Sequence, residues 1–270
     1  VKSSFFIHFP VAGLRVDSGH EVTTDSSWFA EYYWDEKNKN TSSVSVGVLL
    51  NGNDHLVTNV IVFDFTRVGV EVNGGANVLT NVHTWNGGGV GIAVNANSVR
   101  LQNCYLDYNY LQLTDPDTVV VENTFFLATN AHLVVGAKAS VNNLIFQGNT
   151  YANYGSHQGL PSIQIDNPPF KSAKAVKVAN ELKATVSTEI SRTFLANSKQ
   201  ASWTFDFSSD LLFPELGVEF MQYSVLFKPS APPTSVSYKA MIVDKTKVTV
   251  LFDAATDLVD SFHFTVRQAV

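Results

Sequence analysis

The sequence predicts an all-β chain, a right-handed parallel β-helix followed by a small C-terminal antiparallel β-sandwich. Three gapless repeats begin with the same hydrophobic-glycine pattern at a period of 22, at residues 46–51, 68–73 and 90–95. Within each repeat apolar residues recur at every second position, which is typical of strands with one buried face. A repeat of this length that holds short strands and turns indicates coils that stack on one another, with their glycines in one column.

A break in composition separates the two regions. No asparagine follows Asn197, and seven of the nine prolines lie between Pro161 and Pro233. Residues 1–184 are therefore assigned to the β-helix. Residues 185–270 contain alternating runs separated by turn residues at short spacing, which favours a β-sandwich.

The first strand of each coil is expected to have an apolar inner face. The period of two directs Val68, Val70 and Val72 inward, and it directs Gly69 and Glu71 outward. The outer surface of these strands is then predicted to be a shallow, glycine-lined floor.

A second phase of the same period is marked by Asn59, Asn81 and Asn103, each followed by a short β-like run. Asparagine tolerates a left-handed backbone, and its amide can hydrogen-bond to the equivalent amide of the next coil. We expect these residues to fix the turns and to form an internal ladder of amides.

The runs after these asparagines carry polar and aromatic residues at outward positions. His83 and Trp85 are expected to point outward, and so is Asp107 one coil later. Cys104 should point inward and pack in the core. As the single cysteine, it excludes an intrachain disulfide and a cysteine-based metal cluster.

The first coils contain an insertion at about residues 33–45. It holds the sequon Asn40-Thr41-Ser42, so Asn40 is an expected glycosylation site of a secreted protein. The chain starts within a coil, and an open β-helix end exposes unpaired strands. We expect a further N-terminal segment or a second chain to cover that end.

Composition limits the possible partners. The formal charge of −6 and the low content of charged residues, 16%, argue against a nucleic-acid backbone as partner. No run approaches the roughly 18 apolar residues of a membrane-spanning helix. The turn residues His20 and Asp54 have non-ligand equivalents in other repeats, so neither a metal nor another cofactor is expected.

Several long strings of the chain are similar to one family. They lie at residues 50–55, 70–86, 104–109, 115–116, 123–127 and 203–214. They resemble plant polygalacturonase-like proteins of the quartet type, within the pectate-lyase-like superfamily. The resemblance spans nearly the whole chain and implies a secreted protein that acts on or within a pectin-rich, uronate-containing cell wall.

The resemblance does not settle whether the chain is an enzyme. Where ordinary polygalacturonases carry catalytic acids, this chain has residues 66–68, 89–90 and 109–110, none of them acidic. Inverting hydrolysis needs two carboxyl groups separated by roughly 6.5–9.5 Å. Asp64 and Asp107 are the candidate catalytic acids, and the alternative is that both are solvated surface residues.

Four further residues are candidates for substrate binding. Arg15 and Glu71 are predicted on one outer face. Arg15 would bind a uronate carboxylate there through two hydrogen bonds; the alternative is that both residues form ordinary surface ion pairs. His83 and Trp85 would form a platform for a sugar ring unless other segments cover them. Two functions stay open: a polysaccharide-directed hydrolase with a divergent active site, or a non-catalytic carbohydrate-binding or assembly protein of the extracellular matrix.

Overall fold

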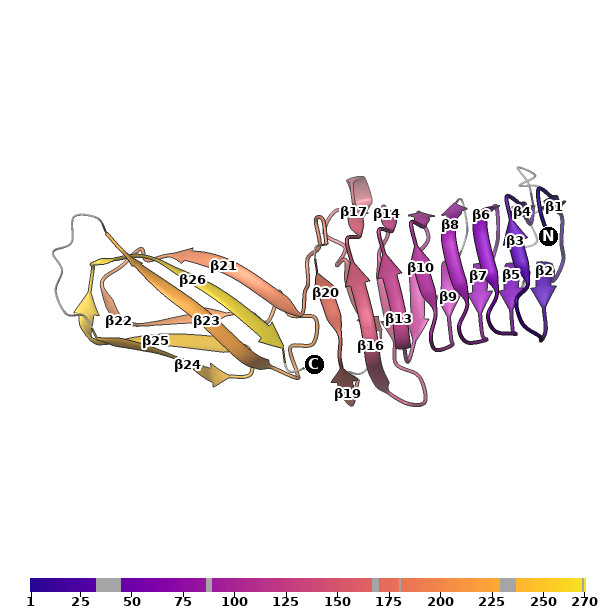
Figure 1. Ribbon diagram of the computed structural model, residues 1–270. Helices are drawn as coiled ribbons and strands as arrows, with labels where there is room; N and C mark the ends of the chain where they lie inside the picture. The colour runs from indigo at the N-terminus through magenta and orange to yellow at the C-terminus, as the bar shows by residue number, and fades with distance from the viewer. Residues whose placement is uncertain (33–44, 86–88, 167–169, 180, 229–236, 269) are drawn as a thin grey trace. The chain divides into compact units, whose positions relative to one another are not determined.

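The computed structural model describes residues 1–32, 45–85, 89–166, 170–179, 181–228, 237–268 and 270 (Figure 1). The chain divides into two compact units, Val1–Thr185 and Val186–Val270. In the described ranges, no helix combines the length and apolar character needed to cross a lipid bilayer. The predicted insertion lies outside these ranges apart from Ser45.

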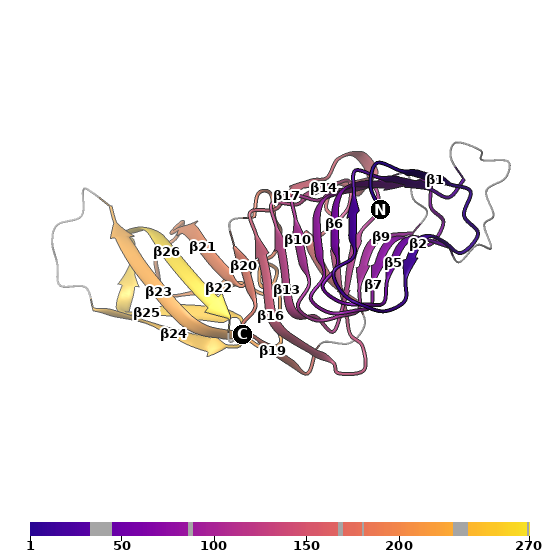
Figure 2. The same ribbon diagram turned by 45° about the vertical axis from the view of Figure 1, so that its right-hand side comes forward.

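The first unit is a parallel β-helix, which confirms the predicted fold. Its strands form two parallel sheets, called sheet A and sheet B, whose members lie side by side in successive coils (Figures 1 and 2). Sheet B contains β2 (Ala12–Val16), β5 (Val46–Leu50), β7 (Val68–Val72), β9 (Val90–Val94), β12 (Leu111–Thr114), β15 (Ala131–Val134) and β18 (Ile163–Asp166).

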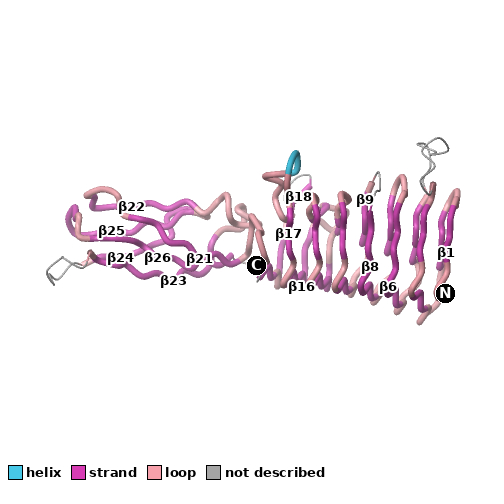
Figure 3. Tube along the Cα trace, turned by 90° about the horizontal axis from the view of Figure 1, so that it is seen from above, coloured by secondary structure: helices cyan, strands magenta, loops and turns pink. Residues whose placement is uncertain are grey.

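Sheet A has longer and shorter strands that pair in parallel with the coils before and after them. Figure 3 shows the stacked strands from another side, with the 3-10 helix η1 (Gly155–His157). The main path of sheet A contains β1 (Phe5–Ile7), β4 (Trp28–Ala30), β6 (Leu56–Phe63), β8 (Val78–Trp85), β10 (Arg100–Gln102), β13 (Asp117–Glu122), β16 (Ser140–Gln147) and β19 (Ser172–Lys174). Beside this path lie β3 (Thr23–Asp25), β11 (Tyr105–Asp107), β14 (Phe125–Leu127), β17 (Thr150–Ala152) and β20 (Lys177–Ala179).

The 22-residue period sets the register of sheet B. Val46 pairs with Val68, and Val68 pairs with Val90, so the intervening glycines form the predicted column. A Cβ atom added at Gly69 would lie 2.6 Å from the carbonyl oxygen of Gly91 in the next coil. Only glycine leaves room for this close approach of two backbones.

The predicted direction of the glycines is wrong. A Cβ atom at Gly69 would point toward Phe65 and Thr84, which are both fully buried. Val68 instead belongs to a separate apolar cluster with Val46 and Ala93. The expectation fails because strict alternation does not hold at the start of these strands, so the glycine-lined outer floor does not exist.

Asparagine ladders fix the turns as predicted, but they lie on the surface. Asn81 has a positive φ of 55° and is exposed, and its Nδ2 donates to Oδ1 of Asn59 at 2.8 Å. Nδ2 of Asn59 donates in turn to Oδ1 of Asp25 at 3.0 Å. The left-handed conformation turns these side chains outward, so the prediction of an internal ladder is wrong.

One later coil departs from the repeat read in the sequence. In the column of turn asparagines, Asn123 is followed by Gly148, whose φ is also positive. Cys104 is buried as expected, and burial raises the pKa of its thiol to about 11.

The second unit consists of antiparallel sheets, as predicted for its fold. One sheet contains β21 (Glu189–Leu195), β26 (Val259–Gln268) and β23 (Val218–Phe227), and the other contains β22 (Gln200–Asp206), β25 (Lys247–Thr256) and β24 (Tyr238–Asp244). Residues from both sheets, including Trp203, Phe205 and Phe262, form one apolar core. The unit is therefore a small β-sandwich.

Candidate functional site

The outer face of sheet A brings together three of the predicted site residues. His83 and Trp85 lie on β8, and Trp85 pairs with Asp107 on the neighbouring β11. All three are partly exposed, whereas the intervening Thr84 and Leu106 are fully buried. Parallel stacking of coils with strand alternation thus places the three side chains on one surface.

Stacked rings form an aromatic face around Asp107, defined here as Phe63, His83, Trp85, Tyr105 and Phe125. The Trp85 ring lies parallel to Phe63 at 5.2 Å between centroids, and the His83 ring lies parallel to Tyr105 at 4.3 Å. Phe125 meets the edge of Tyr105 at 5.4 Å. Phe63 is buried, whereas Phe125 is 37% exposed. The face therefore presents apolar ring surface to solvent.

The environment of the Asp107 side chain disfavours the ionised form of its carboxyl group. Its Oδ1 atom is buried and has no hydrogen-bond partner within the described chain. Burial raises the pKa of Asp107, although its interaction with the Tyr105 hydroxyl acts in the opposite direction. Burial also lowers the pKa of His83, so its ring is neutral at pH 7. The 4.0 Å separation of His83 Nε2 and Asp107 Oδ2 is therefore not an ion pair.

Further aromatic residues lie in the turns next to Asp107. The hydroxyls of Tyr108 and Tyr154 form a hydrogen bond, and their rings meet edge to face. The ring of His157 lies 5.6 Å from that of Tyr108. The hydrogen bond from Tyr108, with a smaller effect of burial, raises the pKa of Tyr154 to about 12. Both tyrosines are about half exposed and offer hydroxyls to a ligand.

Asp64 does not join Asp107. It follows β6 with a positive φ of 49°, and the whole residue is buried. The alternative that Asp64 is a solvated turn residue is therefore wrong. An acid in this position does not face a surface groove together with Asp107.

Arg15 and Glu71 lie on the outer face of sheet B, aligned through Leu49 as the repeat predicts. Each already has an oppositely charged neighbour. Arg15 Nε contacts Oδ1 of Asp17 at 2.5 Å, and Glu71 Oε2 contacts Nη2 of Arg67 at 2.5 Å. Arg15 and Glu71 therefore form surface ion pairs, which is the alternative interpretation of these two residues.

A histidine–carboxylate pair on the same face was not found by sequence reasoning. His132 Nδ1 lies 2.7 Å from Oδ2 of Asp166, and its Nε2 lies 3.0 Å from Oδ1 of Asn130. The ring also stacks on Tyr110 at 4.2 Å. Both ring nitrogens of His132 therefore have partners within the chain.

Two further expectations concern glycosylation and metal binding. Asn40 lies outside the described residues. Within the described part of the chain, no group of three or more histidine, cysteine, aspartate or glutamate side chains is placed to hold a metal ion.

Tyr105 and Tyr154 were not among the predicted site residues, and the sequence contains a signal for only one of them. Tyr105 pairs directly with His83, so the repeat itself could have identified it. Tyr154 is 46 positions from Tyr108 and lies in a turn that departs from the repeat, so no periodic signal pointed to it.

Comparison with known proteins identifies the same architecture. The family described as right-handed beta helix region matches residues 22–164. The chain is 30% identical over 224 residues to polygalacturonase QRT3 of Arabidopsis thaliana, a match that covers 79% of this chain and 46% of that protein. The chain therefore spans about half the length of this relative.

Among solved structures, the chain is similar to phage tailspike proteins. Tailspike gp49 of Pseudomonas phage LKA1 matches with a TM-score of 0.43 at 8% identity, over 98% of this chain and 63% of that one. The Dettilon tailspike gp208 matches with a TM-score of 0.42 at 11% identity, over 97% and 66% of the two chains.

Proposed function

Because this chain belongs to the right-handed β-helix family, we propose that it is an extracellular, polysaccharide-directed β-helix protein that binds carbohydrate along its aromatic face. The observation that carries the proposal is the row of stacked, partly exposed rings of His83, Trp85 and Tyr105 beside the carboxylate of Asp107. Similarity to a plant polygalacturonase supports a carbohydrate partner.

The chemistry of the aromatic face suits a sugar. The C–H faces of a pyranose are apolar and pack on aromatic rings, while the hydroxyls need polar partners at the ring edges. The hydroxyls of Tyr108 and Tyr154 lie in the adjoining turns, and both tyrosines are about half exposed. Strands β8, β11 and β14 contain no lysine or arginine. The proposed ligand of this face is therefore an uncharged stretch of polysaccharide.

Hydrolysis is the second candidate, and one observation favours it. A carboxyl group with a raised pKa can donate a proton to a glycosidic oxygen, and burial raises the pKa of Asp107. The second carboxylate that hydrolysis needs is not supplied by the residues paired with Asp107 in register, Trp85 and Leu127. Binding without cleavage therefore fits the aromatic face better than catalysis.

The decisive measurement is polysaccharide binding by a Trp85→Ala variant. Removing the indole removes apolar stacking surface, so we expect the dissociation constant for methyl-esterified pectin to rise about tenfold, which corresponds to ~1.4 kcal/mol. Isothermal titration calorimetry or affinity electrophoresis would measure the change. The matched control is Phe227→Ala, which removes a 38% exposed aromatic ring from the second unit and should leave binding unchanged.

Equal binding by Trp85→Ala and the wild-type protein would contradict the proposal. Release of reducing ends from the same pectin, abolished by Asp107→Asn, would favour the hydrolase instead. Binding without release of reducing ends would favour the non-catalytic function.

A further inference from the structure

A buried histidine joins the coil that contains β3 to the coil that contains β6, and it shares no residue with the aromatic face. His55 directly precedes β6 and is only 1% exposed. Its Nδ1 atom accepts the backbone N–H of Val22 at 3.1 Å. The backbone N–H of Leu56 donates to the carbonyl oxygen of Val22 at 3.0 Å. Both backbone polar groups of Val22 are therefore held by the next coil.

The contact with Val22 determines the protonation state of the His55 ring. A backbone N–H only donates, so Nδ1 must carry a lone pair, and the one proton of the neutral ring is on Nε2. Nε2 is buried and has no hydrogen-bond partner among the described residues. A Cβ atom added at Gly52 would lie 2.5 Å from Nε2, so glycine makes room for the ring. A second proton, on Nδ1, would point at the N–H of Val22 and break the hydrogen bond between the coils.

The equivalent contact in the next coil uses a side chain that does not titrate. Asn77 follows His55 by one period of 22 residues, and its Oδ1 accepts the backbone N–H of His55 at 2.7 Å. In a later coil, Oδ1 of Asn149 accepts the backbone N–H of Thr124 at 2.8 Å. An amide oxygen accepts such a bond whatever the pH, whereas a histidine nitrogen accepts it only when the ring is neutral. His55 therefore adds a dependence on pH to a contact that asparagine makes elsewhere in the fold.

The charged groups nearest to His55 do not compensate a positive ring. Burial is the largest cause that lowers the pKa of His55 from its ordinary value of 6.5, and His20 acts in the same direction. The charge of Asp54 acts in the opposite direction. However, Oδ2 of Asp54 already contacts Nδ1 of His20 at 3.0 Å. The environment as a whole therefore favours the neutral ring.

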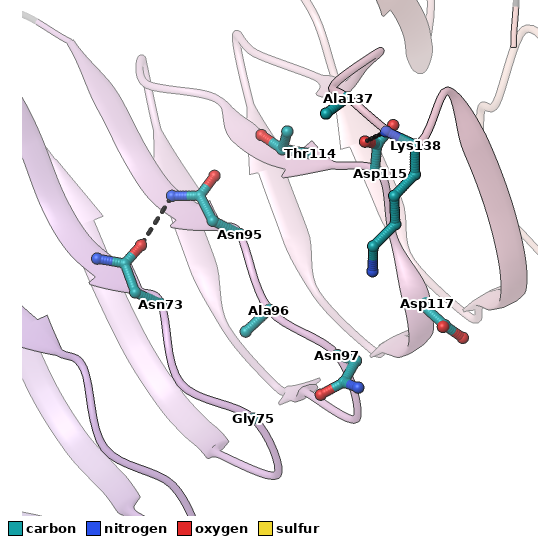
Figure 4. A pocket seen from close by; sticks show the side chains of 10 residues that line it. All are labelled: Asn73, Gly75, Asn95, Ala96, Asn97, Thr114, Asp115, Asp117, Ala137 and Lys138. Carbon is teal, nitrogen blue, oxygen red and sulfur yellow. Dashed lines mark hydrogen bonds between the residues drawn. The ribbon is translucent and has the colours of Figure 1, made fainter. Parts of the chain in front are cut away.

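The neighbouring turns add no compensating charge. The turn of the following coil, residues 73–77, contains no charged residue. Its Asn73 lines a surface pocket, where it accepts a hydrogen bond from Nδ2 of Asn95 at 2.9 Å (Figure 4). In the turn of the preceding coil, Asp17 and Glu21 are exposed, so solvent and salt screen their charges.

We propose that His55 is an acid-sensitive latch, whose protonation releases the turn at Val22 and strand β3 from β6. Release exposes the ring to water, where the charged form is well solvated. Because β3 pairs with residues 56–58 of β6, its release leaves this edge of sheet A unpaired. The inference concerns other residues than the proposed function and does not require it.

The direction of the pH dependence follows from the neutral ring. In the released turn His55 has its ordinary pKa of 6.5, and in the closed contact its pKa is lower. The stabilisation of the closed contact is therefore fully present above pH 6.5, and it is lost as the pH falls from 6.5 toward the folded-state pKa. Uptake of one proton makes opening up to about tenfold more frequent per pH unit in this window.

Hydrogen exchange measured by NMR at about pH 7.5 and about pH 5.5 tests the latch. Protection factors compare each amide with its unfolded rate at the same pH, so those of Val22 and Leu56 report how often the turn opens. Both should fall several-fold at the lower pH, with about tenfold per pH unit as the limit. The amide of Val120 donates to the carbonyl oxygen of Val99 at 3.0 Å, at the equivalent place in a later coil, and should keep its protection.

Three variants separate the histidine from other sources of pH dependence. His55→Asn supplies the acceptor that Asn77 provides one coil later, so the Val22 amide should be protected equally at both pH values. His55→Phe fills the space of the ring without an acceptor, so the protection of Val22 should be low at both. His20→Asn is the matched control, because it removes the exposed neighbouring histidine and should leave the pH dependence of Val22 in place.

Equal protection of Val22 at the two pH values in the wild-type protein would overturn the inference, and so would a pH dependence that persists in His55→Asn. If His55→Asn leaves Val22 unprotected at pH 7.5, the nitrogen chemical shifts of the wild-type His55 ring decide. A proton on Nε2 alone at pH 7.5, and loss of Val22 protection as the ring gains its second proton, would support the latch. A proton on Nδ1 at pH 7.5 would contradict it.

Discussion

Asp107 combines burial with an unused hydrogen-bond acceptor. Burial raises the pKa of its carboxyl above the ordinary value of 3.8, so the folded chain holds this proton more tightly than the unfolded chain does. The resulting contribution to stability is fully present below pH 3.8, and it is lost as the pH rises through the folded-state pKa. At neutral pH the ionised side chain therefore destabilises the fold.

Asp107→Asn should accordingly stabilise the protein at pH 7, because the amide keeps the shape of the side chain and carries no charge. We expect Tm to rise by roughly 2–4 °C, the shift that corresponds to ~1 kcal/mol in a protein of this size. The difference should shrink as the pH falls toward 3.5, where the wild-type carboxyl is also protonated. Differential scanning calorimetry across this pH range would measure it.

Asp25 provides the control of opposite sign. The hydrogen bond from Asn59 is the largest cause that lowers the pKa of Asp25, so its contribution is present above pH 3.8 and is lost as the pH falls through the lower folded-state pKa. Asp25→Asn should lower Tm at pH 7. If both substitutions shifted Tm in the same direction, the assigned surroundings of Asp107 would be incorrect.

At the scale of the coil, the surface asparagine ladders combine a turn conformation with a hydrogen bond. Asn81 satisfies both requirements, since it adopts a positive φ and donates to Asn59. Toward the N-terminus the ladder ends at Asp25, whose carboxylate accepts the hydrogen bond from the amide of Asn59. Another ladder, from Asn95 through Asn73 to Asn51, ends in the same way at Asp17. Carboxylates are suited to this place because they accept hydrogen bonds and donate none.

Replacement of Asn81 by glycine and by alanine separates the two requirements. Asn81→Gly keeps the left-handed backbone accessible and loses only the ladder bond, so the free energy of unfolding should fall by ~1 kcal/mol. Asn81→Ala should cost about 1 kcal/mol more, because a Cβ atom disfavours this conformation. Urea denaturation would measure both values.

Two outcomes would contradict this account of the ladder. Equal stability of Asn81→Gly and Asn81→Ala would mean that the backbone conformation does not select asparagine. Wild-type stability of Asn81→Gly would mean that the amide hydrogen bond contributes nothing. Ala76→Gly is the matched control, since Ala76 already has a positive φ without a polar side chain and should not be destabilised by glycine.

At the scale of the whole chain, most of the structure that could be predicted from the sequence follows from the 22-residue repeat. The spacing of Gly47, Gly69 and Gly91 predicts the coils, because stacking in register brings equivalent residues together. The same register predicts that Trp85 and Asp107 share a face. The inward direction of Gly69 was not predictable, since it depends on side chains of the opposite sheet that fill the space beside it.

Contacts between irregular segments escaped prediction for a different reason. Asp64 follows the end of β6, where the alternation that predicts inward and outward positions no longer applies. The contact of Tyr108 with Tyr154 joins turns of different coils. Turn residues have no fixed period, so their neighbours become visible only in three dimensions.

The second unit should fold without the first, because its apolar residues pack on one another. Trp203, Phe205 and Phe262 belong to a single core made from both antiparallel sheets. Residues 186–270 expressed alone should therefore give a near-ultraviolet circular dichroism signal from Trp203 and one cooperative unfolding transition. Phe262→Ala should abolish both, since emptying a fully buried phenylalanine site costs about 3–5 kcal/mol. Phe220→Ala removes a 43% exposed ring and should preserve both signals. A fragment without a near-ultraviolet signal would mean that this core does not suffice to hold the sandwich.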